Sequence, residues 1–195
     1  PKYLWSYTAN DNPNVGYSYG APIITKLNGS WVVLLTSGHN NIPEGTDYLP
    51  ANGGGYVWAI DAGSGAVVKT WSTGAGSTIS PAGLASLNVK AADFELDNSM
   101  LAAYGGDLLG NLWRFKNDGT TELIISLPSD QPITAAPEIG EIDGKTVLFF
   151  GTGRYLGSND LALDKQQALY AVKDNETTTS SLGKLIPKSI SGTSI

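Results

Sequence analysis

The stretch that decides the fold is residues 101–115, Leu-Ala-Ala-Tyr-Gly-Gly-Asp-Leu-Leu-Gly-Asn-Leu-Trp-Arg-Phe. Small and apolar residues lead into Gly105 and Gly106, and residues 107–110 have the composition of a turn. Residues 111–115 then alternate polar and apolar side chains. This pattern predicts a hairpin of two short strands joined by a tight turn.

Weaker copies of the same plan lie on both sides of this hairpin. On its N-terminal side the sequence predicts strands at residues 3–7, 20–24, 31–36, 56–61 and 66–71. A second unit, which contains the hairpin, opens with residues 79–84 and closes with a strand at residues 121–127. The strands predicted for a third unit are residues 135–139, 147–151, 168–172 and 182–186.

Three prolines mark the starts of these units, because Pro22, Pro81 and Pro137 lie 59 and 56 residues apart. Four short strands per unit, with a proline or glycine at the start and an aromatic residue in the third strand, are typical of β-propeller blades. A single blade exposes both faces of a small sheet, so it becomes stable only between neighbours. An ordinary β-sandwich is the alternative, but the matched positions favour the propeller.

We therefore predict an all-β fold built from quinoprotein-like, four-stranded β-propeller blades. The three blades are placed at roughly residues 15–73, 77–128 and 132–187. Residues 1–8 are predicted to be the outer strand of a preceding blade, because Trp5-Ser6 repeats Trp71-Ser72. Propellers have about 4–8 blades, so three blades predict a fragment of a larger propeller.

Composition narrows the classes of function. The formal net charge of −6 and the lack of any Lys/Arg run argue against a surface for nucleic acid or anionic membranes. With no cysteine, the chain has no disulfide, no cysteine-based zinc site and no thiol catalysis. The sequence shows no signal peptide or transmembrane segment. It begins with Pro1 rather than Met, which also indicates a piece of a longer protein.

A tryptophan repeat supports the propeller. Residues 59–65, Ala-Ile-Asp-Ala-Gly-Ser-Gly, are followed by Trp71 and match the tryptophan-docking repeat of quinoprotein-type propellers. The glycine permits a positive-φ turn between the third and fourth strands, and the tryptophan fills the gap between blades. The motif indicates architecture and not activity.

Two short patterns resemble catalytic or cofactor motifs without their structural context. Residues 16–20, Gly-Tyr-Ser-Tyr-Gly, match a nucleophile elbow, which needs a strand before the serine and a helix after it. Here a proline and a strand follow, and His39 is the only base available, so we expect a loop histidine. Residues 151–157, Gly-Thr-Gly-Arg-Tyr-Leu-Gly, resemble a dinucleotide loop but lack the βαβ unit, which predicts a structural turn.

An acidic segment resembles part of a calcium-binding loop. Asp93, Glu95 and Asp97 stand at positions 1, 3 and 5 of an EF-hand-like loop. Such a loop wants glycine at position 6 and oxygen ligands at positions 9 and 12, where this chain has Asn98, Leu101 and Tyr104. We therefore predict a solvated acidic loop, with bound calcium as the open alternative.

Taken together, these segments resemble the C-terminal propeller of the type IV pilus tip and biogenesis family, the PilC/PilY proteins. The resemblance runs over nearly the whole chain, and its most recognisable string is residues 104–115. The segments that carry it are residues 36–41, 54–61, 80–84, 96–98, 104–115, 151–157 and 167–173.

The resemblance implies a non-enzymatic protein at the pilus tip or outer membrane of a Gram-negative bacterium. Such a protein helps pili to assemble against retraction and contributes to surface or host adhesion. The implied partners are pilins or minor pilins and a host or abiotic surface, with no nucleic acid and no membrane span. We expect binding through loops on the propeller faces, the longest being residues 39–55 and 154–166.

The resemblance also bears on calcium, because some family members carry a calcium loop just before the string that matches residues 104–115. This chain keeps the acids of residues 93–97 but lacks the family's glycine and final aspartate. We therefore predict no cofactor. We also predict no catalytic, cofactor-binding or metal-binding residue, and we assign Trp113, at the place of Trp58 and Tyr170, to packing between blades.

Two other functions stay open. The tryptophan repeat also suits a quinoprotein dehydrogenase, a class that resembles propellers holding a quinone and calcium in the central channel. Many such enzymes have an adjacent cysteine pair there, whereas this chain has no cysteine and no visible set of channel ligands. The third hypothesis is an outer-membrane assembly scaffold built from the same blades.

Overall fold

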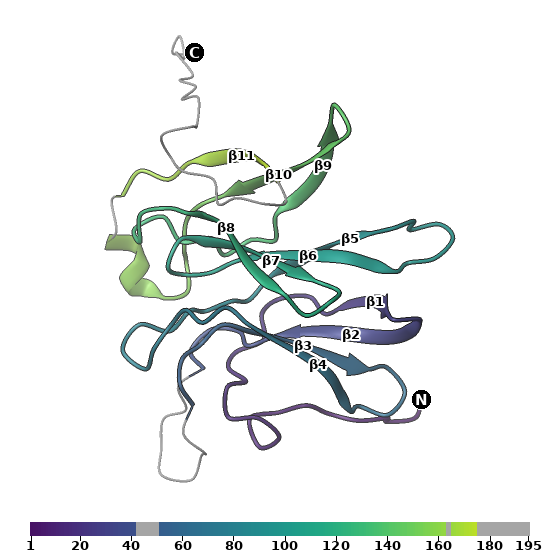
Figure 1. The fold of residues 1–195 in the computed structure, drawn as a ribbon. Coiled ribbons are helices and arrows are strands. Elements are labelled where there is room, and N and C mark those ends of the chain that lie inside the picture. Colours follow the sequence, from purple (N-terminus) through teal and green to yellow (C-terminus); the bar gives the residue numbers. More distant parts are fainter. Residues whose placement is uncertain (42–50, 163–164, 175–195) are drawn as a thin grey trace.

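The computed structural model describes residues 1–41, 51–162 and 165–174. In this part of the chain, antiparallel strands form three sheets that stack one on another (Figure 1). Within each sheet, strands that follow one another in the sequence are hydrogen-bonded neighbours. Each sheet is therefore a meander, which is the topology of a propeller blade.

We number the sheets as blades 1, 2 and 3. Blade 1 contains β1 (Ile23–Leu27), β2 (Ser30–Thr36), β3 (Tyr56–Asp61) and β4 (Val67–Ser72). Blade 2 contains β5 (Leu87–Ala91), β6 (Met100–Gly106), β7 (Asn111–Lys116) and β8 (Thr121–Ser126). Blade 3 contains β9 (Glu138–Ile142), β10 (Lys145–Gly151) and β11 (Leu169–Lys173), with the 3₁₀ helix η1 (Ser158–Ala162) between β10 and β11.

Tight turns fix the register of the hairpins. Asn28 and Gly29 join β1 to β2 with φ of 50° and 82°, as a two-residue type I′ turn requires. Asp143 and Gly144 join β9 to β10 in the same way, with φ of 53° and 71°. Residues 107–110 form the turn between β6 and β7, as the sequence predicts.

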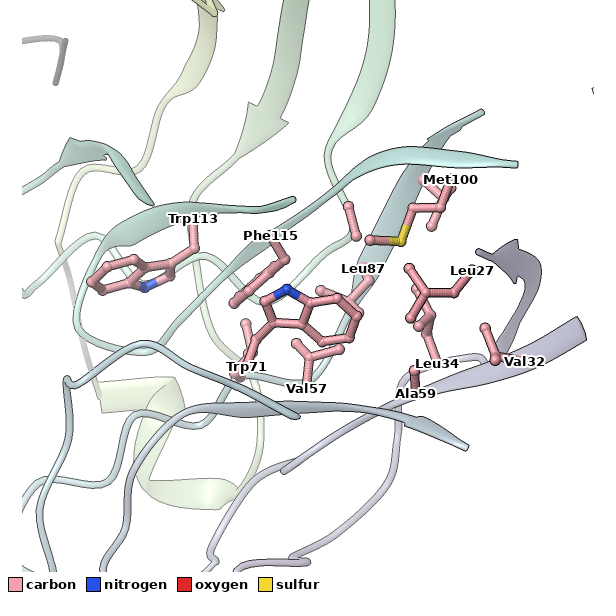
Figure 2. Close-up of a cluster of buried hydrophobic side chains, with 13 residues drawn as sticks. Leu27, Val32, Leu34, Val57, Ala59, Trp71, Leu87, Met100, Trp113 and Phe115 are labelled. Atoms are coloured by element: carbon pink, nitrogen blue, oxygen red, sulfur yellow. The ribbon is translucent and has the colours of Figure 1, made fainter. Parts of the chain in front are cut away.

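The first large core cluster lies between blades 1 and 2 (Figure 2). Val57 and Ala59 of β3 contribute to it from blade 1, and Trp113 and Phe115 of β7 contribute from blade 2. Side chains on a strand alternate between its two faces. Because two residues at alternate positions of each third strand enter this cluster, one face of each third strand is buried there.

Trp71 of β4 closes the outer part of this first interface. Its side chain is 1% exposed, and its indole N–H donates to the carbonyl oxygen of Lys116, 2.8 Å away in blade 2. Trp71 pairs with Val57 across blade 1, and Ile125 pairs with Leu112 at the matching place in blade 2. Ile125 is fully buried in the second core cluster, so it fills the gap that Trp71 fills one blade earlier.

The interface between blades 2 and 3 contains an ionic network beside its apolar cluster. Arg114 of β7 forms an ion pair with Asp174, which follows β11, and another with Glu122 of β8. The hydroxyl of Tyr104 donates to Asp174 Oδ2 at 2.8 Å. Arg114 and Asp174 are 5% and 6% exposed, so two opposite charges are buried where the blades meet.

The predicted place of Trp113 is confirmed. Trp113 belongs to the core cluster between blades 1 and 2. Tyr170 of β11 packs against the core cluster between blades 2 and 3. Trp58 lies on the sheet face opposite Val57, where its ring meets Tyr7 with 5.6 Å between centroids. Each of these aromatic residues therefore faces the segment that precedes its own blade in the sequence.

The N-terminal segment differs from the prediction, because residues 3–7 form no strand within the described chain. No described segment pairs with them, and an unpaired backbone has no ladder to extend. Trp5 nevertheless docks as Trp71 does: its indole N–H donates to the carbonyl of Ala62 at 3.1 Å, and it packs on Gly65. The assignment of residues 1–8 to a preceding blade stays a prediction.

The second unit also departs from the predicted pattern. Pro22 and Pro137 directly precede β1 and β9, whereas Pro81 lies six residues before β5. Residues 79–84 form no strand, because their backbone has other partners: the carbonyl of Ala82 accepts from Leu108 N, and that of Leu84 accepts from Gly38 N. The strand predicted at 182–186 lies outside the described residues.

Candidate binding face

The connections between the second and third strands of each blade, and those that lead from one blade to the next, lie at one end of the blades, on the left of Figure 1. We call this end the loop face. Its described parts are residues 37–41, 73–86, 107–110, 127–137 and 152–162. The opposite end, on the right, carries the hairpin connections between the first and second strands and between the third and fourth strands, and is called the turn face. The predicted binding loops 39–55 and 154–166 both begin on the loop face, although residues 42–50 and 163–164 lie outside the described residues.

A repeated hydrogen bond holds the base of the connection between the second and third strands of each blade. Directly after the second strand of each blade stands an acceptor side chain, Ser37, Asp107 or Thr152. Its oxygen accepts the backbone N–H that leads into the third strand. These N–H donors belong to Tyr56 at 3.1 Å, Asn111 at 2.9 Å and Ala168 at 2.9 Å. The three positions match by strand register, which makes the loop face a regular frame.

Asp107, which is fully buried like Ser37, accepts hydrogen bonds with both of its carboxylate oxygens. Its Oδ1 accepts from the backbone N–H groups of Leu109 and Asn111, and its Oδ2 accepts from the Asn111 amide and from the Trp113 indole N–H at 2.8 Å. Burial raises the pKa of Asp107, and these N–H donors lower it by a smaller amount. Both carboxylate oxygens are therefore occupied within the turn, and Asp107 is a structural residue.

His39 is buried on the loop face and not presented to solvent. Its backbone forms an antiparallel bridge with Tyr17, and the ring of Tyr19 lies 5.9 Å from its own ring. Nδ1 has no hydrogen-bond partner among the described residues. Burial lowers the pKa of His39, and the positive charge of Arg154 lowers it further. Residues 16–20 have no strand-to-helix turn, so the nucleophile-elbow geometry is absent from this segment.

Asp160 closes the glycine-rich loop of residues 151–157. Its Oδ2 accepts from the N–H groups of Leu156 at 2.7 Å and Gly157 at 3.2 Å, and its Oδ1 accepts from Arg154 Nε at 2.8 Å. The Leu156 N–H and the Arg154 guanidinium lower the pKa of Asp160. A 3₁₀ helix of five residues follows, not the long helix of a dinucleotide fold. The predicted structural turn agrees with this geometry.

A pocket of about 340 Å³ opens beside this loop, and most of the residues that line it have polar or charged side chains. Its wall combines the segment entering blade 3, with Ser129 and Asp130, and the connection after β10, with Arg154, Lys165 and Gln167. Sequence reasoning missed this pocket because the two segments are more than twenty residues apart. The signal available was a charged, loop-composition segment at each place, which does not reveal that the two meet.

The acidic loop lies on the turn face. The side chain of Asp93 accepts from the N–H groups of Glu95 at 2.8 Å and Leu96 at 3.0 Å, and Asp97 lies 3.5 Å from Lys26 Nζ. These carboxylates therefore fold the loop and contact blade 1. In the described part of the chain, no three or more His, Cys, Asp or Glu side chains are grouped as metal ligands. The same residues include no helix that is long and apolar enough to cross a membrane.

Stacked meanders of three or four described strands, with their cores between sheets and a tryptophan docked from one sheet to the next, define blades of a β-propeller. The chain belongs to the family described as the PilY1 beta-propeller domain, which matches residues 8–124. It is similar to the type IV pilus biogenesis factor PilY1 of Pseudomonas aeruginosa PAO1, with 29% identity over 93% of this chain. A PilY1 homolog of Xylella fastidiosa Temecula1 is 30% identical over 91% of the chain.

A solved structure supports the same assignment. The crystal structure of the Pseudomonas aeruginosa PilY1 C-terminal domain aligns with a TM-score of 0.73 and 27% identity, over 92% of this chain and 42% of that one. The chain spans 18% and 14% of the two relatives named above. The predicted family and the predicted propeller blades are therefore confirmed.

Proposed function

We propose that this chain acts by binding, without catalysis, in the biogenesis of type IV pili. The observation that carries the proposal is membership of the PilY1 propeller family, whose relatives are named as type IV pilus biogenesis factors. The fold suits binding, because rigid blades present variable connections on one face. In this role the protein supports pilus assembly against retraction and contributes to adhesion.

The proposed partners are pilins or minor pilins and a host or abiotic surface. The proposed location is the cell surface of a Gram-negative bacterium, at the pilus tip or the outer membrane. A net charge of −6 is consistent with protein or surface ligands and unfavourable for nucleic acid. The loop face is the part of the fold that we assign to these contacts.

The assembly role is tested by deleting the gene in its natural host, with and without an active pilus-retraction motor. We expect surface pili to disappear when retraction is active, to reappear when the motor is disabled, and to be restored by the natural gene. Surface pili would be measured in sheared fractions. Unchanged surface pili in the deletion strain would contradict the assembly role.

The adhesive role is tested with two matched pairs of substitutions. Tyr155→Ser with Leu161→Ser removes side chains that are 70% and 74% exposed on the loop face. Phe94→Ser with Leu96→Ser removes side chains that are 64% and 85% exposed on the turn face. At equal surface piliation, we expect only the loop-face pair to reduce attachment. Equal attachment by both variants and the natural protein would contradict binding through this face.

The quinoprotein alternative depends on the tryptophan repeat, and the structure gives that repeat a packing role. Trp71 is used to dock blade 1 on blade 2. Addition of pyrroloquinoline quinone and calcium tests the alternative directly: a perturbed quinone spectrum with dye reduction would favour the dehydrogenase. The scaffold hypothesis would be favoured instead if pull-downs recovered barrel-assembly components and no pilins.

A further inference from the structure

The pocket beside the glycine-rich loop is lined by Arg154, whose guanidinium is held in place by a hydrogen bond to Asp160. Arg154 Nε donates to Asp160 at 2.8 Å, and two backbone N–H groups hold Asp160 in turn. The terminal guanidinium nitrogens have no acceptor among the described residues, and the side chain is 35% exposed. A guanidinium in this position is pre-oriented to donate to a carboxylate from outside the chain.

The rest of the wall supplies both donors and acceptors. Lys165 Nζ lies 4.0 Å from Asp130 Oδ2, which is a long contact between half-exposed groups. Gln167 uses its amide N–H groups on the carbonyls of Asp130 and Lys165. Its side-chain oxygen and the Ser129 hydroxyl also belong to the lining residues. Hydroxyl groups, which both donate and accept, match such a wall better than an apolar ligand does.

Two cations, Arg154 and Lys165, and two carboxylates, Asp130 and Asp160, line the pocket. Burial is the main reason that the pKa of His39 is lowered, and the positive charge of Arg154 lowers it further. The guanidinium therefore acts electrostatically on a residue of blade 1, although it is paired within blade 3. The four charges that line the pocket sum to zero, but the terminal guanidinium nitrogens of Arg154 and the loosely paired Lys165 leave donors for a single anionic group.

We propose that this pocket binds an acidic saccharide of the uronate class, a ligand that would give the proposed adhesive function its substrate chemistry. The sugar carboxylate pairs with the free edge of Arg154 and with Lys165, and its hydroxyls donate to Asp130 and Gln167. A volume of about 340 Å³ lies at the lower end of small-molecule sites. An extended acidic peptide is disfavoured, because Asp130 and Asp160 would repel its additional carboxylates.

The test uses the intact natural protein and four probes: D-glucuronate, D-glucose, acetate and a tetraglutamate peptide. Titrations followed by saturation-transfer NMR should show saturable binding of glucuronate, with glucose and acetate each weaker by about tenfold or more, since each lacks one set of contacts. Arg154→Gln should weaken glucuronate by about tenfold, and Lys165→Gln by less. The matched control is Lys145→Gln, an exposed cation on the turn face, which should change nothing.

Three outcomes would overturn the proposal. If acetate bound as tightly as glucuronate, the pocket would recognise only the carboxylate and not the sugar. If glucose bound as tightly as glucuronate, the ion pair with Arg154 would contribute nothing to binding. Tighter binding of a tetraglutamate peptide would identify a peptide site. Because Arg154→Gln removes a contact to Asp160, thermal unfolding is recorded for every variant. Lys165→Gln, which leaves that contact intact, keeps the test valid if Arg154→Gln is unstable.

The inference and the proposed function can fail separately. If glucuronate does not bind but deletion of the gene still abolishes surface pili, only the saccharide pocket is wrong. If glucuronate binds and depends on Arg154, but deletion changes neither pili nor attachment, the pocket stands and the proposed function is wrong.

Discussion

The two interfaces between blades close the same gap with different chemistry. Between blades 1 and 2, Trp71 fills the outer gap and fixes its indole on the carbonyl of Lys116. Between blades 2 and 3, Ile125 takes the matching place, and the buried pair of Arg114 and Asp174 lies in the same interface. One interface is therefore held mainly by apolar burial, and the other combines a smaller side chain with paired charges.

The two kinds of contact differ in what they contribute: apolar burial supplies most of the stabilising energy, and an ion pair restricts orientation. Apolar burial stabilises in proportion to the area removed from water and is weakly directional. A buried ion pair adds little net stability but is costly when one partner is lost, because the other charge remains unpaired. We infer that the first interface is the stronger of the two, and that Arg114 and Asp174 set the orientation of blade 3.

The largest effect is expected from Trp71→Ala. Removing a fully buried tryptophan should lower the free energy of unfolding by about 3–5 kcal/mol, because a cavity opens at the first interface and the bond to Lys116 is lost. Urea denaturation measures this change. Val68→Ala, on the same strand and 52% exposed, should stay within about 0.5 kcal/mol. A loss below about 1 kcal/mol for Trp71→Ala would show that the first interface does not depend on the docked indole.

Asp174→Asn tests the ionic interface. The substitution keeps the size of the side chain but removes its charge opposite Arg114, and it should cost about 1.5–3 kcal/mol in unfolding free energy. Asp143→Asn is the control, since Asp143 is exposed in a turn where asparagine is also favourable. If the two variants unfolded at the same urea concentration, the buried pair would contribute nothing to the second interface.

Trp5→Ala extends the comparison to the outer face of blade 1. Trp5 docks on Ala62 as Trp71 docks on Lys116, but it is only half-buried. Its loss should therefore cost about 1–2 kcal/mol, in line with partial burial of a large side chain. Tyr3→Ala, 76% exposed, should be near neutral in the same denaturation series. A cost for Trp5→Ala equal to that of Trp71→Ala would remove the distinction between these two docking sites.

The local pattern of the sequence predicts the blades well, because strand alternation and turn chemistry act over a few residues. The turn at residues 107–110 and the inter-blade position of Trp113 are examples. Pro81 shows the limit of such reasoning. It matches Pro22 in spacing but not in structural position, because the backbone after Pro81 bonds to blade 1 and to the turn between β6 and β7 before β5 begins.

The ion pair of the second interface and the pocket of the loop face could not be predicted from local sequence patterns. Arg114 and Asp174 are 60 residues apart, and nothing local indicates that they pair. The pocket around Arg154 likewise needs two distant segments to meet. Only the acceptor repeat of Ser37, Asp107 and Thr152 had a usable signal, since each residue directly follows a second strand.

The smallest expected effect is a response to acid at the loop-face end of the first interface. His39 Nδ1 lies close to Gly83, where an added Cβ would be 3.2 Å away, and no described residue accepts or donates there. Because burial lowers the pKa of His39 in the folded protein, the unfolded chain binds the proton more readily. The stability due to neutral His39 is therefore complete above about pH 6.5. It is lost as the pH falls from there through the lowered folded-state pKa.

This response is measured as the change in unfolding free energy between pH 7.5 and pH 5.5, for the natural protein and for His39→Gln. Carboxylates that titrate in both proteins cancel in the difference, so the remaining slope belongs to the histidine. We expect the natural protein to lose more stability than the variant over this interval. An equal loss would mean that protonated His39 is accommodated at the first interface. That interface would then be as tolerant of charge as the second, where a buried guanidinium is already paired.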